Sequence, residues 1–297
     1  MNARFNMPEF YRGKNIYACL MEQIKDNPDI LLPNTEIATI FGTFPASVWN
    51  GGGLYTVGSI SKEEMRDTIG FFNYELGISL RFTFTNPLVS ESQYFDTYSN
   101  LIAELGHNGH NQIIVTNPGL ENYLRKNYPN YKYCRSIVAA RVEPYARRSP
   151  FGDYHISVMR RNMNNNWEYL DQIPIEDRPY IEFLCCDPCP DNCPRIYSHY
   201  RDFARAQCEY SLGNDACDCS MGKVKTNFPY YNMQNKLKTY ISREMIDNDY
   251  LPKGFSEFKC SGRGSRVSVI HNILVYMIKP EYWSDLYFAF FDAEGIK

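Results

Sequence analysis

The chain has 297 residues, of which 44% are hydrophobic and 22% charged, and its formal net charge at pH 7 is −3. This is enough apolar material for one large core or two modest ones. The slightly negative net charge excludes a protein that binds nucleic acid through a basic surface spread over the whole chain. One local basic segment remains, residues 140–161, and we expect it to be a solvated loop. The longest apolar stretch, residues 267–278, is too short for a membrane span. The first residues contain no apolar core of a signal peptide, so we expect a cytoplasmic protein.

The first predicted element in chain order is an amphipathic helix over residues 14–25, where four apolar side chains recur at helical spacing. We assign residues 1–34 to an N-terminal helical segment. Residues 35–44 then read as a compact strand that ends at a proline. The glycines at 51–53 form a loop whose backbone N–H groups can approach a ligand closely, although the loop is not a phosphate-binding fingerprint.

From residue 61 onward the predicted helices and strands alternate. Ser61 reads as an N-cap with Glu64 three residues later, which is a capping box. The further strands are expected at residues 78–85, 112–116, 134–139, 155–160, 180–184, 238–246 (a short strand plus a turn) and 255–260. The main helices are expected at 61–77, 92–106, 120–129, 198–210 and 265–279. Such alternation is typical of a parallel sheet. Together with residues 35–44 it predicts an α/β fold with one (β/α)8 TIM-like barrel over residues 35–297.

Polar residues recur where the predicted strands end. In a barrel the carboxyl ends of all strands form one mouth, and active sites lie there. The residues that we predict to bind substrate at this mouth are Trp49, Asn50, Asn86, Asn117 and Arg161. Each asparagine taken alone is better explained as a turn or cap residue. Their recurrence after successive strands favours a binding mouth.

Seven of the ten cysteines fall within residues 181–219: Cys185, Cys186, Cys189, Cys193, Cys208, Cys217 and Cys219. An apolar strand leads to the first pair, and thiols crowded at the end of a strand indicate an inorganic centre. An iron–sulfur cluster fits four thiolates on an irregular loop, and we favour it. Structural zinc fits two short-spaced pairs, Cys189-x3-Cys193 and Cys217-x-Cys219. Disulfides would need an oxidising compartment, and the thiols are otherwise explained as small buried hydrophobes.

Three segments resemble the collagenase-like peptidase family of (β/α)8 barrels, which includes oxygen-independent ubiquinone-biosynthesis proteins and RNA-hydroxylation proteins. The segment FKCSGRG, residues 258–264, resembles the family's FKIEGR before its last helix, with Ser261 in place of the glutamate. The spacing Cys186-x6-Cys193, followed by Cys208, is similar to the family's cluster segment. The stretch NQIIVTNPGLENYLRKNYP, residues 111–129, is similar to the family's strand, turn and helix.

The resemblance implies a 4Fe-4S cluster and a role in O2-independent hydroxylation or in modification of RNA or a cofactor precursor. It places Cys186, Cys193 and Cys208 at the first three ligand positions, and Cys217 or Cys219 would have to supply the fourth. The alternative set, from spacing, is Cys189, Cys193, Cys217 and Cys219. The resemblance also implies a partner subunit of the same family, while the substrate, a small molecule or RNA, is left open.

Three residues are candidates for a catalytic role. His199 follows the cysteines and is placed to hydrogen-bond a cluster sulfur or to donate a proton, the alternative being a helix cap. Arg263 lies just past the last strand, where an arginine binds an anionic group of a substrate or forms a buried ion pair. Glu182 alternates into the barrel as a general base or as the partner of an arginine. A non-catalytic zinc-stabilised binding barrel and a peptidase are the alternative functions.

Overall fold

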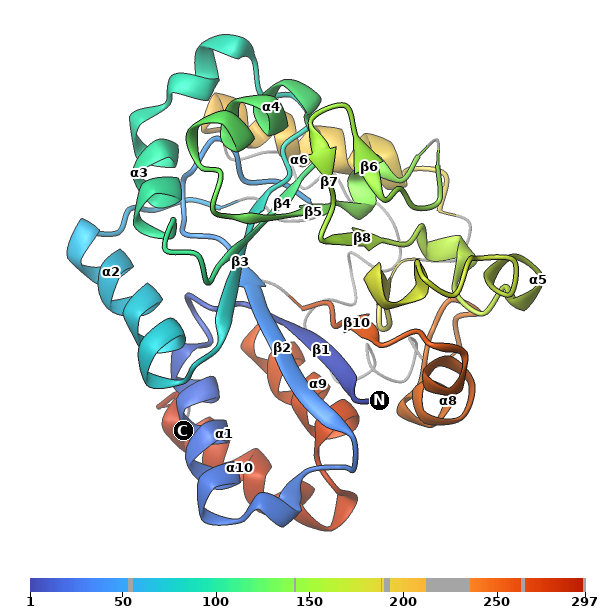
Figure 1. The fold of residues 1–297 in the computed structure, drawn as a ribbon. Coiled ribbons are helices and arrows are strands. Elements are labelled where there is room, and N and C mark those ends of the chain that lie inside the picture. The colour runs from blue at the N-terminus through green and yellow to red at the C-terminus, as the bar shows by residue number, and fades with distance from the viewer. Residues whose placement is uncertain are drawn as a thin grey trace.

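The computed structural model describes residues 1–52, 56–141, 143–187, 189, 193–211, 236–262 and 265–295. In this part of the chain, eight parallel strands close into a barrel surrounded by helices (Figure 1). Their order around the barrel is β1 (Ala3–Pro8), β10 (Glu257–Lys259), β9 (Ile181–Leu184), β8 (Ile156–Val158), β5 (Lys132–Arg135), β4 (Gln112–Val115), β3 (Ser79–Phe84) and β2 (Thr35–Gly42). The predicted α/β fold with a TIM-like barrel is confirmed.

The described α-helices are α1 (Lys14–Asp26), α2 (Lys62–Gly70), α3 (Thr97–Leu105), α4 (Pro118–Asn127), α5 (Trp167–Leu170), α6 (Ile196–Glu209), α8 (Arg243–Met245), α9 (Arg266–Met277) and α10 (Trp283–Ala293). Figure 1 shows α1, α9 and α10 packed together beside β1 and β2, with α2 and α3 on the next side of the barrel. As predicted, the Ser61 side chain caps α2 by accepting from the Glu64 backbone N–H. No helix in the described ranges is long and apolar enough to cross a membrane.

The connection between β5 and β8 departs from the alternating pattern. Among the described residues of this connection, a short antiparallel hairpin of β6 (Arg148–Ser149) and β7 (Gly152–Asp153) takes the place of an α-helix. The hairpin lies within the basic segment at residues 140–161. Its Arg148 pairs with Asp153 at 2.8 Å, so the charge of this arginine is balanced within the hairpin itself.

Two predictions about the strands are wrong. One predicted strand is absent and one observed strand was not predicted, so the number of strands in the barrel is still eight. Residues 238–246 form turns and α8 instead of a strand. The eighth strand is β1, which lies between β2 and β10 and closes the barrel. Residues 1–34 are therefore not a helical segment that precedes the barrel, because they contribute its first strand as well as α1.

β1 is a strand because its side chains alternate between two different environments. Phe5 points outward, where its ring lies 6.0 Å from that of Phe258 and 5.7 Å from that of Tyr276 on α9. Arg4 points inward and pairs with Glu36 on β2 and with Glu257 on β10. The inward Arg4 thus joins β1 to both neighbouring strands, and the outward Phe5 joins it to β10 and to helix α9.

Helix α6 lies over the carboxyl end of the barrel. Its first turn places Tyr197 under the guanidinium of Arg141, which follows β5. Near its last turn, the Ala204 carbonyl accepts from the side chain of Asn86, which follows β3. The helix predicted at residues 198–210 is therefore present, and the structure shows that it covers part of the mouth.

Candidate functional site

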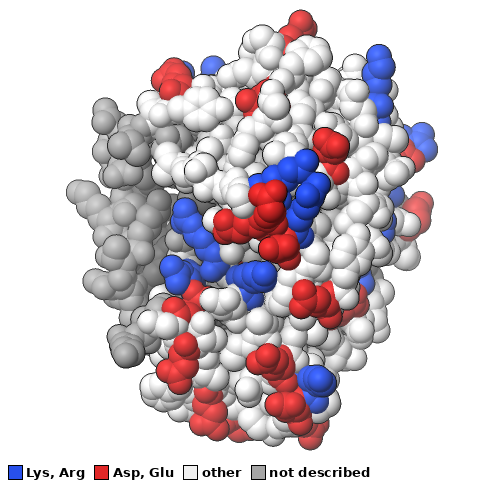
Figure 2. All heavy atoms as spheres, turned by 90° about the vertical axis from the view of Figure 1, so that its left-hand side faces the viewer, with Lys and Arg blue, Asp and Glu red and all other residues white. Residues whose placement is uncertain are grey.

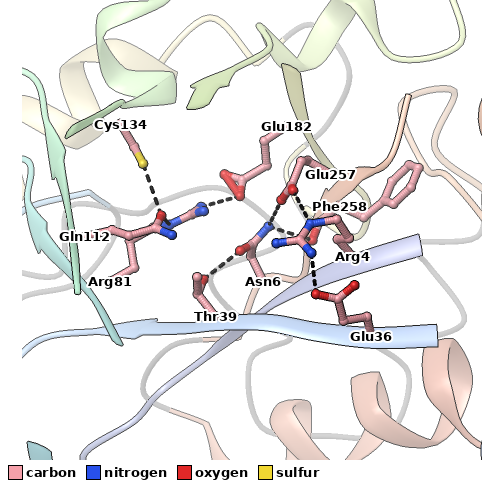
Figure 3. Close-up of polar contacts among 10 residues, drawn as sticks. All are labelled: Arg4, Asn6, Glu36, Thr39, Arg81, Gln112, Cys134, Glu182, Glu257 and Phe258. Atoms are coloured by element: carbon pink, nitrogen blue, oxygen red, sulfur yellow. Dashed lines mark hydrogen bonds and ion pairs between the residues drawn. The ribbon is translucent and has the colours of Figure 1, made fainter. Parts of the chain in front are cut away.

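The barrel interior holds a network of nine charged and polar side chains that come from seven of the eight strands (Figure 3). Arg81 on β3 donates to Glu182 on β9 and, at 2.8 Å, to Gln112 on β4. Arg81 is 1% exposed and Glu182 is fully buried. The second oxygen of Glu182, Oε2, has no hydrogen-bond partner within the described residues.

The same network continues to β1 and β10. The Asn6 side chain donates to Glu257 at 3.0 Å and accepts from Thr39 at 2.6 Å. Arg4 reaches Glu257 at 2.6 Å. Most of these residues stand at or near the first positions of their strands, and this end of a barrel generally serves stability instead of chemistry. Glu182 is thus paired with an arginine, the alternative that the sequence left open, and its role as a general base stays a prediction.

At the opposite, carboxyl end, the loop after β9 is attached to the residue that follows β8. Arg161 is 4% exposed, and its guanidinium donates to the Cys189 carbonyl at 2.6 Å and lies 3.5 Å from Asp187. Burial, together with the nearby charges of Asp187 and Cys193, raises the pKa of the Cys189 thiol far above its ordinary value, against the lowering effect of Arg161. Arg161 therefore holds the backbone at Cys189, and Cys193 adds a small contribution to the raised pKa of the Cys189 thiol.

The ligand set implied by the resemblance does not fit one metal centre. Cys193 precedes α6 and Cys208 lies in its last turn, so a helix with a rise of 1.5 Å per residue separates the two by roughly 20 Å. Thiolates that share a cluster must lie within a few ångströms of its irons. Within the described ranges, no group of three or more His, Cys, Asp or Glu side chains is arranged to hold a metal ion. The alternative set includes Cys217 and Cys219, which lie outside the described residues, and it stays a prediction.

Cys208 instead contacts the residues that follow β3. Its Sγ accepts from Asn86 Nδ2 at 3.3 Å and donates to Gln93 Oε1 at 3.9 Å. Asn86 also donates to the Val48 carbonyl at 2.8 Å. These contacts attach the end of α6 to the loops after β2 and β3.

Cys186 belongs to a different group, at the adjacent ends of β9 and β10. The side chain of Cys260 interacts with those of Cys185 and Cys186 and contributes to the pKa shift of each. The Ser261 backbone N–H donates to Cys186 Sγ at 3.2 Å. Cys186 also donates to Asn272 Oδ1 on α9 at 3.5 Å. Cys260 was not predicted to belong with the other thiols, because it lies far from them in the sequence. It comes close to them because β9 and β10 are neighbouring strands.

The remaining predicted substrate-binding residues are occupied by contacts within the protein. Trp49 is fully buried, and its indole N–H donates to the Gln93 carbonyl at 2.8 Å. Asn50 accepts from Thr43 and donates to Thr56 at 2.9 Å. Asn117 caps α4 by accepting from the Leu120 N–H at 3.0 Å. These bonds hold loops at the mouth, and a role in substrate binding stays a prediction.

For the other two catalytic candidates, His199 and Arg263, a catalytic role stays a prediction. The His199 ring stacks on Phe203 of the same helix at 4.7 Å. Arg263 lies outside the described residues.

Charges of both signs occur at the surface. On the face in Figure 2, which includes α2 and α3, Lys and Arg side chains lie next to Asp and Glu side chains. In the basic segment at residues 140–161, Arg147 pairs with Asp177 at 3.4 Å and stacks on Tyr180. Contacts within the protein are thus made by four arginines of this segment, Arg141, Arg147, Arg148 and Arg161, as expected for a structural loop.

No protein-family model, curated protein or solved structure matches this chain.

Proposed function

We propose that the chain is a barrel enzyme whose reaction takes place at the carboxyl end of the strands and depends on a thiolate-bound metal centre on the loop after β9. An iron–sulfur cluster is the first choice of centre. The activity that the resemblance to the collagenase-like peptidase family implies is O2-independent hydroxylation or a related modification of RNA or a cofactor precursor. The observation that supports the proposal is that buried Arg161 attaches Cys189 to the barrel, with Cys193 four residues further along the chain.

The described residues fit half of such a centre. Two neighbouring thiols supply two of the four thiolates that a cubane cluster or a structural zinc needs. Arg161 fixes the backbone of Cys189, and its positive charge offsets part of the negative charge of ligating thiolates. A bound cluster would supply electron transfer at the mouth. The other two ligands are proposed to be Cys217 and Cys219, from their spacing in the sequence.

Metal analysis under anaerobic conditions tests this proposal. Protein purified without oxygen is expected to be brown and to contain about four irons per chain, with acid-labile sulfide. Cys189→Ser and Cys193→Ser should each lose the iron. Cys208→Ser is the matched control, because Cys208 lies at the far end of α6 and should leave the iron content unchanged.

The second candidate, a non-catalytic binding barrel with structural zinc, is supported by the short spacing of Cys189-x3-Cys193. If the protein holds one tightly bound zinc per chain, and Cys189→Ser and Cys193→Ser each lose it, the zinc-stabilised binding barrel is supported in place of the iron–sulfur enzyme. A folded, anaerobically prepared protein with neither metal would refute both.

A further inference from the structure

Three thiols meet where β9 and β10 end. These strands are neighbours in the barrel, with Lys259 opposite Leu184 in the last registered pair. The next residues are Cys260 after β10 and Cys185 and Cys186 after β9. The backbone N–H of Ser261, which follows Cys260, donates to Cys186 Sγ at 3.2 Å, and the Cys260 side chain affects the pKa of both other thiols. Cys186 is 2% exposed and the other two are fully buried. The group is separate from the pair Cys189 and Cys193, on which the proposed function rests.

The three sulfurs are not equivalent, because hydrogen-bond donors converge on only one of them. Cys186 Sγ receives the Ser261 backbone N–H at 3.2 Å, and the Ser261 hydroxyl, which donates to the Cys186 carbonyl at 2.5 Å, lies 3.6 Å from the same sulfur. The neighbouring Cys260 side chain is the largest cause of a lowered pKa at Cys186, against the effect of burial. Burial raises the pKa of Cys185 and, much more strongly, that of Cys260.

Cys134 shows what burial alone does to a thiol in this protein. It is fully buried inside the barrel, and its Sγ donates to Gln112 Oε1 at 3.3 Å. Burial raises the pKa of Cys134 to about 11, which keeps it protonated and unreactive. Cys186 is equally enclosed but has donors that stabilise a thiolate, together with a second thiol in contact. This arrangement is that of an attacking and a resolving cysteine.

We propose that Cys186 and Cys260 form a thiol–disulfide redox site that is oxidised by small peroxides. The Cys186 thiolate attacks one oxygen of hydrogen peroxide, so that an S–O bond forms, the O–O bond breaks and hydroxide leaves. The sulfenic acid is then attacked by Cys260 sulfur, which forms the S–S bond and releases the oxygen as water with the thiol proton. The two thiols lose two electrons in total, and the peroxide is reduced to two water molecules.

Burial determines the size of the oxidant and the identity of the partner. Cys186 is only 2% exposed, which is too little for a bulky disulfide such as oxidised glutathione to reach its sulfur, so the proposed oxidant is a small peroxide. Cys185 is the competing partner for Cys260. Both thiols donate to an oxygen, Cys185 to the Lys259 carbonyl at 3.3 Å and Cys186 to Asn272 Oδ1 at 3.5 Å. They differ in that Cys185 lacks the Ser261 N–H donor and burial raises its pKa, so its thiol stays protonated.

Peptide mapping of the whole reduced protein tests the proposal. The protein is treated with stoichiometric hydrogen peroxide, denatured with an alkylating agent and digested with trypsin. Cleavage after Lys259 and Arg263 isolates Cys260 in a peptide with no other cysteine. We expect this peptide to become linked to the one that contains Cys186, to be two hydrogen atoms lighter than the sum of both, and to be released by dithiothreitol. Oxidised glutathione should not produce this link.

Variants then identify the attacking sulfur. Cys186→Ser should abolish the link to Cys260, whereas Cys185→Ser and Cys134→Ser should retain it. Circular dichroism of each variant shows that it is folded, and the wild-type map stands even if one variant fails to fold. The proposal is wrong if Cys260 stays alkylated in the wild type after half-buried Cys19 has been oxidised, or if the link persists in Cys186→Ser. Because these readouts do not involve metal, they are independent of the proposed function.

Discussion

Arg81 extends from β3 into the barrel interior, where it is 1% exposed. Removing a guanidinium from water costs several kcal/mol unless an opposite charge and further hydrogen bonds compensate it. Burial lowers the pKa of Arg81 and the Glu182 carboxylate raises it, with a net increase. The two side chains come from positions 101 residues apart, so each charge is buried only because the folded barrel supplies the other.

Replacing Glu182 should therefore be much more harmful than removing an exposed ion pair. Glu182→Gln keeps the volume but leaves the Arg81 charge uncompensated, and we expect a loss of about 3–5 kcal/mol in the free energy of unfolding. Urea denaturation measures it. Arg148→Ala is the control, because the Arg148–Asp153 pair is 81% and 67% exposed and should contribute less than about 1 kcal/mol. The double variant Arg81→Met with Glu182→Gln should be less destabilised than the sum of the single variants, and simple additivity would contradict the coupling.

His155 makes the stability depend on pH. Burial lowers the pKa of His155 to about 4, and the positive charges of Lys132, Arg81, Arg4 and Arg147 add to this effect. The unfolded chain binds the proton near pH 6.5 and the folded one only near pH 4, so stability is fully present above pH 6.5 and is lost as the pH falls through this window. The shift corresponds to ~3 kcal/mol, which partial solvent exposure reduces to about 1–2 kcal/mol.

His155→Gln removes this contribution without adding a charge. Unfolding free energies of the variant should fall less between pH 6.5 and pH 4.5 than those of the wild type, while carboxylates contribute equally to both proteins. His110→Gln is the matched control, because His110 is exposed. Identical pH profiles for the wild type and His155→Gln would show that His155 does not carry the effect.

Among the elements, α6 is held over the mouth by a small number of buried polar contacts. Gln207 is fully buried and bonds both backbone groups of Thr56, accepting from its N–H at 2.9 Å and donating to its carbonyl at 3.1 Å. Thr56 in turn bonds Asn50, which is attached to the end of β2. One glutamine therefore connects the last turn of α6 to the loop after β2.

Gln207→Ala should release this end of the helix. Two buried backbone groups of Thr56 lose their partners, and each unsatisfied group costs about 1–3 kcal/mol. Hydrogen exchange of the amides in α6 should become faster, while exchange in β3 and β4 stays as in the wild type. Asn127→Ala is the control, since its exposed side chain donates only to the Tyr123 carbonyl on its own helix. Unchanged exchange in α6 would contradict the anchoring role of Gln207.

At the scale of the whole molecule, the barrel is closed by β1. This strand pairs with β2 on one side and with β10 on the other, so it joins the first and last parts of the described barrel. Without it, both neighbours would expose an unpaired edge, and the outward Phe5 would no longer pack against Tyr276.

A variant that lacks residues 1–8 tests this closure. We expect it to lose the near-ultraviolet circular dichroism signal of packed aromatic side chains and to lose cooperative unfolding in urea. Phe288→Ala, at a residue 65% exposed on α10, should leave both unchanged. If the deletion variant kept both properties, β1 would not be needed to close the barrel.

The sequence alone determined the elements whose signals are local. Local sequence patterns predicted α1, α4 and α9 to within two residues at each end, the capping box at Ser61 marked the start of α2, and apolar runs bounded by turn residues predicted β2, β3 and β4. The class and size of the fold follow from that alternation. β1 was missed because its inward residues are Arg4 and Asn6, whose partners lie on β2 and β10 and are invisible to a local pattern.

Only the tertiary structure decided which distant residues meet. It placed Cys193 and Cys208 at opposite ends of α6, although their spacing along the chain resembles a ligand set. It brought Cys260 to Cys186 because β9 and β10 are neighbours in the barrel, and it paired Arg81 with Glu182 across the interior. Local periodicity depends on contacts a few residues apart, whereas the order of strands and the path of α6 depend on burial and pairing summed over the whole chain.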